Sequence, residues 1–426
     1  MKMNLNGHFG KNNALESTSA GEKGGKVFFL FCLWTLVSLS RPQDFFPALA
    51  PLRPALTMGV LTLFFYFLNF KRKSLIVLKE KQVRYFFLLV LIMILSIPTS
   101  LYIMQSLEKF FLEYTMVVAY FVIFVLIVDS IDKIYKVLFL ACVGCGIYSF
   151  FTVMSGTFES GRLEFGSMFD ANDLAFFVLC FIPLNLIFIS KDNKLLTRIL
   201  CLTALLLGIV LIFLSGSRGG MLALGFAFSA ILFRKTISVK KGFKIFAVIA
   251  GALMLSVSSI DTDRLMTLFT LKQDYNFTAE GGRLDLWGIG IKAMLENPLT
   301  GVGVGSFPNA VGNQRKRLDA DTQAWQRAHN SVIQIGTETG VFGLMLFLML
   351  SWNVAKIFAR TSREATSIKL KKIGEMGLAG FLGMFTAAFF LSQAYSIYWA
   401  FYIMFSVVVF RFLSRELALE GKKAKL

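Results

Sequence analysis

The stretch RILCLTALLLGIVLIFLSGSRGGMLALGFAFSAILF (residues 198–233) consists of two apolar runs separated by a short polar turn. A helix rises 1.5 Å per residue, so roughly 20 apolar residues are enough to cross about 30 Å of hydrocarbon. The two runs, 198–214 and 219–233, therefore predict two membrane-crossing helices that run in opposite directions. The turn between them contains a single cation, Arg218.

The rest of the chain repeats this pattern of apolar runs and short polar turns. Hydrophobic residues make up 56% of the sequence and charged residues 16%, which is not the composition of a soluble protein. Because the runs show no alternation of polar and apolar residues, membrane strands are excluded. We predict an all-α polytopic membrane protein of about 12 transmembrane helices. The other predicted spans are 27–40, 54–70, 84–103, 111–128, 134–154, 174–190, 243–260, 331–355, 373–392 and 395–413.

The distribution of cations predicts the orientation. With the amino terminus in the cytoplasm, 31 of the 44 lysines and arginines fall on the inner side. The positive-inside rule therefore predicts that both termini are cytoplasmic. The inner segments are 1–26, 71–83, 129–136, 191–198, 234–244, 356–372 and 411–426, and Arg84 at a helix boundary is counted with them.

These assignments divide the chain into five parts. Residues 261–330 form the longest loop, which is too long for a simple connector and is predicted to be a periplasmic subdomain. Within it, RLDLWGIGIKAMLENP (283–298) has the apolar spacing of an amphipathic helix that ends at Asn297. The other predicted parts are a disordered cytoplasmic tail (1–26), transmembrane helices 1–9 (27–260), transmembrane helices 10–12 (331–413) and a second cytoplasmic tail (414–426).

Several functional classes are excluded or disfavoured by the sequence. The net charge of +18 is spread over short loops, which argues against nucleic-acid binding. The five cysteines all fall in predicted helices, and the chain has neither Gly-x-Ser-x-Gly nor His-Glu-x-x-His. The glycines of TGVGVGSFPNA (300–310) lack a Gly-Lys-Ser/Thr and are interpreted as a tight turn rather than a nucleotide site. We expect a reaction that needs no metal and no cofactor.

Arg218 is the most informative single cation. An arginine at the edge of hydrocarbon costs on the order of 3 kcal/mol or less. The helix predicted to begin near Gly219 would direct its amino-terminal N–H groups to the same place, next to a planar guanidinium group. These features together predict an anion site. The alternative, a snorkelling residue that anchors the end of a helix, is equally compatible with the sequence.

Two further segments have a similar arrangement. In EGGRLDLWG, glycines and Arg283 precede a predicted helix. In SGRLEFGSMFDANDLAFF (160–177), Arg162 precedes Asp170 and Asn172 at the mouth of another helix. We expect Asp170 or Asn172 to be the amino-terminal cap of that helix, while Arg162 and Asn172 are also candidate substrate-binding residues.

His329 is one of only two histidines in the chain, and the other, His8, lies in the polar tail. The simpler interpretation of His329 is an interfacial residue at the start of a helix. However, nearby cations lower the pKa of an imidazole and favour the neutral form that accepts a proton. A neutral base beside bound phosphate is what transfer to a hydroxyl acceptor requires. The neighbouring cations, all candidate substrate-binding residues, are Arg315, Arg317 and Arg327.

Glu338 is not expected to orient His329. In a continuous helix the two residues lie about half a turn apart and roughly 13.5 Å apart along the axis. An unpaired carboxylate in the membrane is costly, so we expect Glu338 to pair with an arginine of a neighbouring helix.

Four segments together resemble the bacterial O-antigen ligase and polymerase superfamily over about residues 160–350. They are GRLEFGSMFDANDLAFF, SGSRGGMLAL, GGRLDLWGIGIKAMLENPLTGVGVGSF and RAHNSVIQIGTETGVFGLMLF. The resemblance implies a metal-independent, inverting membrane glycosyltransferase. Such an enzyme moves a glycan from undecaprenyl diphosphate to an acceptor hydroxyl at the periplasmic face of the inner membrane. By motif position, Arg218 and Arg283 would bind the donor diphosphate and His329 would activate the acceptor.

The resemblance leaves the acceptor open. O-antigen ligation to lipid A–core is the leading hypothesis, and the alternatives of the same chemistry are a polysaccharide polymerase and a protein O-oligosaccharyltransferase. A transporter is the alternative from another class. Transporters often have two similar halves, whereas here the large loop follows the ninth predicted helix and the unusual charges lie at the outer rim.

Overall fold

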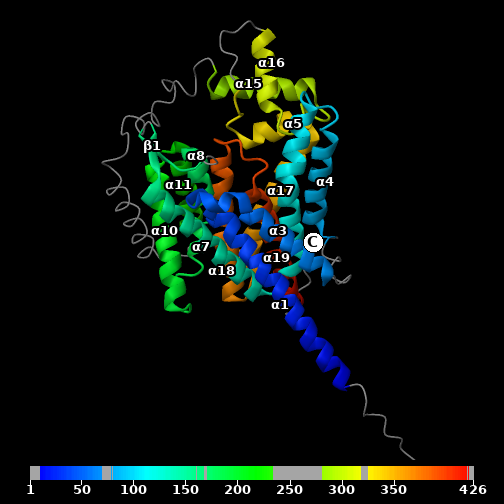
Figure 1. The fold of residues 1–426 in the computed structure, drawn as a ribbon, viewed down its shortest axis with the longest axis vertical. Coiled ribbons are helices and arrows are strands. Elements are labelled where there is room, and N and C mark those ends of the chain that lie inside the picture. Colours follow the sequence, from blue (N-terminus) through cyan, green and yellow to red (C-terminus); the bar gives the residue numbers. More distant parts are fainter. Residues whose placement is uncertain are drawn as a thin grey trace, which may run out of the picture.

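A computed structural model describes residues 10–69, 78, 80–159, 161–166, 170–233, 281–317, 325–419 and 421, with residues 10–24 described by their backbone only. Figure 1 shows a bundle of helices with α15 and α16 at one end of its long axis. In chain order the helices are α1 (Gly10–Ser40), α2 (Pro42–Phe45), the 3-10 helix η1 (Pro47–Leu52), α3 (Pro54–Leu68), α4 (Lys81–Leu95), α5 (Ile103–Glu108), the π-helix η3 (Lys109–Tyr114), α6 (Thr115–Ile127), α7 (Ile131–Ser155), α8 (Ala171–Leu179), α9 (Ile182–Asn185), α10 (Leu195–Leu214), α11 (Arg218–Phe233), α15 (Arg283–Glu296), α16 (Phe307–Arg317), α17 (Ser331–Glu364), α18 (Ile368–Ala388) and α19 (Ile397–Leu419).

The prediction of an all-α fold needs one small correction. Strands β1 (Thr157–Glu159) and β2 (Arg162–Glu164) form an antiparallel hairpin, in which Phe158 is opposite Leu163. Gly161, between the two strands, has a φ of 72°, a conformation that glycine adopts without strain. The hairpin follows α7 and brings Arg162 toward the end of α10.

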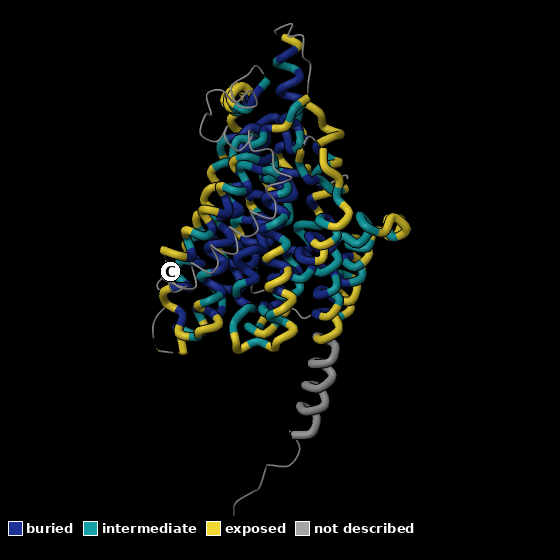
Figure 2. Tube along the Cα trace, turned by 90° about the vertical axis from the view of Figure 1, so that its left-hand side faces the viewer, coloured by how far each residue is buried: buried dark blue, intermediate teal, exposed yellow. Residues whose placement is uncertain are grey.

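The helices have the length and surface of a multi-pass membrane protein. Within the described residues, six helical segments are long and apolar enough to cross a bilayer, and three shorter apolar helices accompany them. Large apolar side chains are exposed, for example Phe67 of α3 and Leu196 of α10, which fits contact with lipid rather than water. Figure 2 shows buried positions in the interior of the bundle and exposed positions along its outside. The predicted span 243–260 lies outside the described residues, so the count of twelve stays a prediction.

The described residues include only part of the predicted cytoplasmic tail (1–26) and of the predicted periplasmic loop (261–330). α1 begins at Gly10, so the structure continues the first helix into the segment predicted to be a disordered tail. Of the predicted periplasmic subdomain, 281–317 and 325–330 are described; the former contains α15 and α16. α15 begins at Arg283 and ends before its C-terminal cap, Asn297, which confirms the predicted amphipathic helix.

The centre of the bundle is formed by α19, whose membrane-length window has the largest buried share among the six candidate spans. α17 consists of two helical parts joined at Gly340, where φ is 72° and ψ is −171°. The kink leaves the N–H of Val341 to bond the carbonyl of Pro298, 2.9 Å away, so the loop after α15 is tied to α17. This contact fixes the position of the glycine-rich stretch that follows.

The glycine-rich stretch is a tight turn, as predicted, and it contains the partner of Glu338. Gly301, Gly303 and Gly305 all have positive φ. The buried carboxylate of Glu338 accepts the backbone N–H groups of Gly305 (2.7 Å) and Phe307 (3.2 Å). The expectation of an arginine partner is therefore wrong: backbone N–H groups in the turn replace it.

Candidate functional site

A pocket lies where three helices begin. Asn172 is in the first turn of α8, Arg218 is the first residue of α11 and Arg283 is the first residue of α15, and all three line the pocket. The first N–H groups of a helix lack intrahelical partners and form the positive end of its dipole. Two arginines and the positive ends of three helix dipoles at one pocket make a site suited to an anion. The other lining residues are Phe176, Ser217, Gly219, Gly220, Ala387, Phe390 and Leu391.

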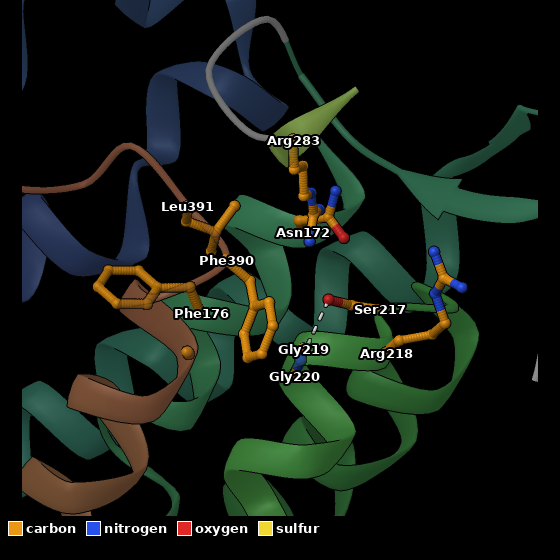
Figure 3. Close-up of a pocket in the computed structure, with 10 residues that line it drawn as sticks. Asn172, Phe176, Ser217, Arg218, Gly219, Gly220, Arg283, Phe390 and Leu391 are labelled. Carbon is orange, nitrogen blue, oxygen red and sulfur yellow. Dashed lines mark hydrogen bonds between the residues drawn. The ribbon is translucent and has the colours of Figure 1, made fainter. Parts of the chain in front are cut away.

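The sequence SGSRGG determines the geometry at the start of α11. The Ser217 hydroxyl oxygen accepts the N–H of Gly220 at 3.2 Å, which caps the helix (Figure 3). A Cβ placed on Gly219 would lie 3.0 Å from the ring of Phe390, so a larger residue would crowd this wall of the pocket. Gly219 therefore lets the backbone of α11 come close to whatever occupies the pocket, whereas Gly220 allows close packing against Ala175 of α8.

Arg162 holds Asn172 rather than lining the pocket itself. Its Nε donates to the carbonyl of Ser215 (3.0 Å), at the end of α10, and its Nη2 donates to Oδ1 of Asn172 (2.8 Å). A guanidinium group can only donate, so the asparagine oxygen must face Arg162. Asp170 caps α8 by accepting the N–H groups of Asn172 and Asp173, which confirms the predicted cap. Asn172 is thus fixed through both its backbone and its side chain.

The wall opposite Arg218 is apolar. Figure 3 shows the rings of Phe176 and Phe390 on one side of the pocket and the guanidinium group of Arg218 on the other, with Ser217 between them in this view. The guanidinium carbon of Arg283 lies 5.9 Å from the centre of the Phe390 ring, within the range of a cation–π contact. The pocket is therefore amphipathic, because cations, N–H donors and aromatic carbon all line it, and Arg283 contacts the aromatic wall.

His329 lies next to this pocket in an unusual backbone conformation. Its φ is +47°, a left-handed conformation that costs a non-glycine residue about 1–3 kcal/mol. Its backbone N–H donates to the hydroxyl of Ser392 (2.8 Å), and the carbonyl of Ala328 accepts the indole N–H of Trp287 (3.0 Å). Asn330 then caps α17 by accepting the N–H groups of residues 332 and 333.

The surroundings of His329 favour its neutral form. Burial lowers the pKa of the imidazole from 6.5, the positive charges of Arg283 and Arg327 lower it further, and Asp170 opposes the shift. Arg283 therefore lines the pocket and also lowers the pKa of the His329 imidazole. An uncharged imidazole near neutral pH can accept a proton.

The remaining predicted cations have different environments. Arg327 is exposed, and its charge acts on both His329 and Asp173. Arg317, at the end of α16, is also exposed. Arg315 is buried: it donates to Gln326 (3.0 Å) and lies 3.7 Å from the carboxylate of Asp285. Arg315 therefore connects α15, α16 and the segment before His329.

The sequence did not indicate that the turn between α18 and α19 belongs to the site. This turn supplies Phe390 and Leu391 to the pocket and Ser392 to the backbone of His329, and Gln393 donates to Asp173 of α8 at 2.7 Å. Its residues are ordinary for a short loop, and only the fold brings them to the site. Trp287 was missed because it occupies an unexceptional position on an amphipathic helix.

The described part of the chain offers no group of three histidine, cysteine, aspartate or glutamate side chains arranged to hold a metal ion. All five cysteines are free and buried. The chemistry that the site presents is thus that of arginines, amide donors and one imidazole.

Comparison with known proteins found a matching family model and a similar curated protein. Residues 203–348 match the family model described as O-antigen ligase. The matched range includes Arg218, Arg283 and His329. A Rickettsia conorii protein named "Putative polysaccharide ligase" is 25% identical over 206 residues. That match covers 46% of this chain and 47% of the relative, so it spans about half the length of each. Residues 203–348 are therefore similar to the O-antigen ligase family, which confirms the resemblance found in the sequence over that part of the chain.

Proposed function

We propose that this protein transfers a glycan from an undecaprenyl-diphosphate carrier to an acceptor hydroxyl, and that the acceptor is lipid A–core. We place the reaction at the periplasmic face of the inner membrane, with both termini of the chain in the cytoplasm. The observation that supports the proposal most is the pocket at which α8, α11 and α15 begin, with His329 beside it.

The pocket fits the donor in both of its chemical parts. A diphosphate carries negative charge and several acceptor oxygens, which suit Arg218, Arg283 and the helix amino termini. The carrier is a hydrocarbon chain, which suits the apolar wall formed by Phe176 and Phe390. A soluble phosphorylated donor would not need such a wall at the end of a membrane bundle.

The reaction that we propose is a single displacement. The imidazole of His329 takes the proton from the acceptor hydroxyl as its oxygen attacks the anomeric carbon of the donor sugar. The bond between that carbon and the diphosphate oxygen breaks, and the electron pair leaves with the carrier diphosphate. Attack from the face opposite the leaving group inverts the anomeric centre. Arg218 and Arg283 stabilise the charge on the leaving group, so the proposed step uses no metal ion.

The acceptor is tested by deleting the gene and asking which molecule loses its glycan. Loss of O-antigen from lipid A–core supports the proposal, whereas loss from a protein or of a long polymer assigns an oligosaccharyltransferase or a polymerase. Restoration by the wild-type chain and by Lys191→Ala, an exposed cation between α9 and α10, controls for expression. Failure of restoration by His329→Ala ties the loss to transfer. Unchanged glycans on all three molecules would contradict the proposed function.

A further inference from the structure

The backbone of His329 is held in a conformation that it would not adopt unaided. It is one of three non-glycine residues with positive φ in the described parts of the chain, and the other two, Arg41 and Arg53, precede prolines. A left-handed non-glycine residue at a functional site persists when its surroundings determine it. The contacts around His329 therefore indicate which residues set its geometry.

These contacts act on the backbone and not on the ring. The residues that the structure describes form no side-chain hydrogen bond to the imidazole, whereas the N–H of His329 donates to Oγ of Ser392 at 2.8 Å. On one side, Trp287 holds the carbonyl of Ala328, and on the other, Asn330 caps α17. The direction of the imidazole relative to Arg283 thus depends on the φ and ψ of His329.

Ser392 can fix this conformation because its own turn is tied down. The carbonyl of Leu391 accepts the hydroxyl of Ser331 (2.7 Å), and Oγ of Ser331 accepts the N–H of Gln393 (3.0 Å). The side-chain amide of Gln393 donates to Asp173 on α8 (2.7 Å). The same turn supplies Phe390, which lies under Arg283. The turn between α18 and α19 therefore contacts the backbone of His329 and lines the donor pocket. It also contacts the starts of α8 and α17.

We propose that Ser392 is a positioning residue, which holds His329 in its left-handed conformation so that the imidazole faces the acceptor beside the bound donor. This proposal rests on the proposed function, because it concerns the geometry of the base in that reaction. Ser392 takes no part in the bond changes. Its removal should slow the transfer step and leave donor binding unchanged.

The test compares three single variants in the full-length protein in detergent or vesicles. Ser392→Ala removes the acceptor of the His329 N–H, Ser392→Thr retains a hydroxyl, and Ser396→Ala removes a hydroxyl of the same turn that has no partner among the described residues. We expect kcat to fall about ten- to one hundred-fold in Ser392→Ala, because small misplacements of a catalytic group have effects of this size. We expect donor Kd to stay within about two-fold, Ser392→Thr to recover most of the rate and Ser396→Ala to match the wild type.

Two outcomes would overturn the proposal: a wild-type kcat in Ser392→Ala, or equal losses of kcat and donor affinity. If Ser392→Ala does not fold, Trp287→Phe provides the second test, since it removes the bond to Ala328 and keeps an aromatic ring. We expect Trp287→Phe also to lower kcat and to leave the donor Kd unchanged. His329→Ala separates the two proposals. Wild-type transfer by His329→Ala contradicts the proposed function, whereas an inactive His329→Ala with a fully active Ser392→Ala contradicts only the positioning role.

Discussion

Arg162 donates a hydrogen bond to Oδ1 of Asn172 across 2.8 Å, and this contact determines which end of the amide is available to the pocket. Because the oxygen is taken by a guanidinium group, the amide presents its NH₂ group to any ligand. A donor group in that place suits an anion, and it joins Arg218 and Arg283 in the lining. Arg162, a candidate substrate-binding residue in the sequence, is itself bonded to Asn172 and to the end of α10.

This arrangement predicts that Asn172→Asp is worse than Asn172→Ala. Alanine loses one hydrogen bond to a charged ligand, worth about 1.5–3 kcal/mol, so donor Kd should rise by about ten- to one hundred-fold. Aspartate keeps a partner for Arg162 but adds a negative charge to the anion site, so its donor Kd should rise further. Equilibrium binding of a lipid diphosphate to both purified variants is the measurement. Equal affinities for wild type and Asn172→Asp would exclude Asn172 from the site.

The pH dependence of transfer should report the lowered pKa of His329. In a His8→Gln protein, His329 is the only histidine, and its NMR titration can be assigned without ambiguity. We expect a pKa below 6.5, mainly because of burial and then because of Arg283 and Arg327. The base is neutral above its pKa, so transfer should fall as the pH decreases through that lowered value. Arg327→Gln should raise the pKa and move the acidic limb of the rate profile to higher pH. A titration at or above 6.5 would contradict this account.

The buried carboxylate of Glu338 should stabilise the fold without binding substrate. Glu338→Ala leaves the N–H groups of Gly305 and Phe307 without their acceptor, at a cost of about 1–3 kcal/mol for each buried donor. Glu338→Gln retains one acceptor oxygen and should be milder. Thermal unfolding in detergent should therefore rank wild type above Gln and Gln above Ala. The same unfolding temperature in all three would show that these bonds contribute nothing.

Arg315 and Arg317 should differ although they lie two residues apart. Arg315→Ala removes a partly buried hydrogen bond to Gln326 and should lower stability by about 1–3 kcal/mol, with little added by the long contact to half-exposed Asp285. Arg317→Ala changes an exposed residue and should leave stability unaffected. Unfolding curves of the two variants test this difference directly. Equal stability of both variants would show that the Arg315 contacts are not structural.

The sequence predicted the features that depend on local patterns. Apolar runs indicated helices, Gly282 and Arg283 indicated the start of one, and Asp170 indicated a cap. It also predicted that the cations before a helix are functional, and the fold brings Arg218 and Arg283 to one pocket.

Features that depend on tertiary contacts were not predictable. The partners of Glu338 are backbone N–H groups of a distant turn, and backbone groups leave no signal in the sequence. The helix-wheel argument for Glu338 assumed a continuous helix, whereas His329 lies outside α17. Ser392 is one hydroxyl among many, and only its 2.8 Å contact with His329 distinguishes it.

The central claim is that Arg218 and Arg283 bind the donor diphosphate beside a base that acts only in transfer. The most direct measurement is the affinity of purified His329→Ala, Arg218→Ala and Arg283→Ala for an undecaprenyl-diphosphate-linked glycan, with transfer assayed on the same samples. We predict wild-type affinity and no transfer for His329→Ala, and at least about ten-fold weaker binding for each arginine variant, since each loses a charge-assisted contact. Unchanged donor affinity in both arginine variants, or transfer by His329→Ala, would contradict the account.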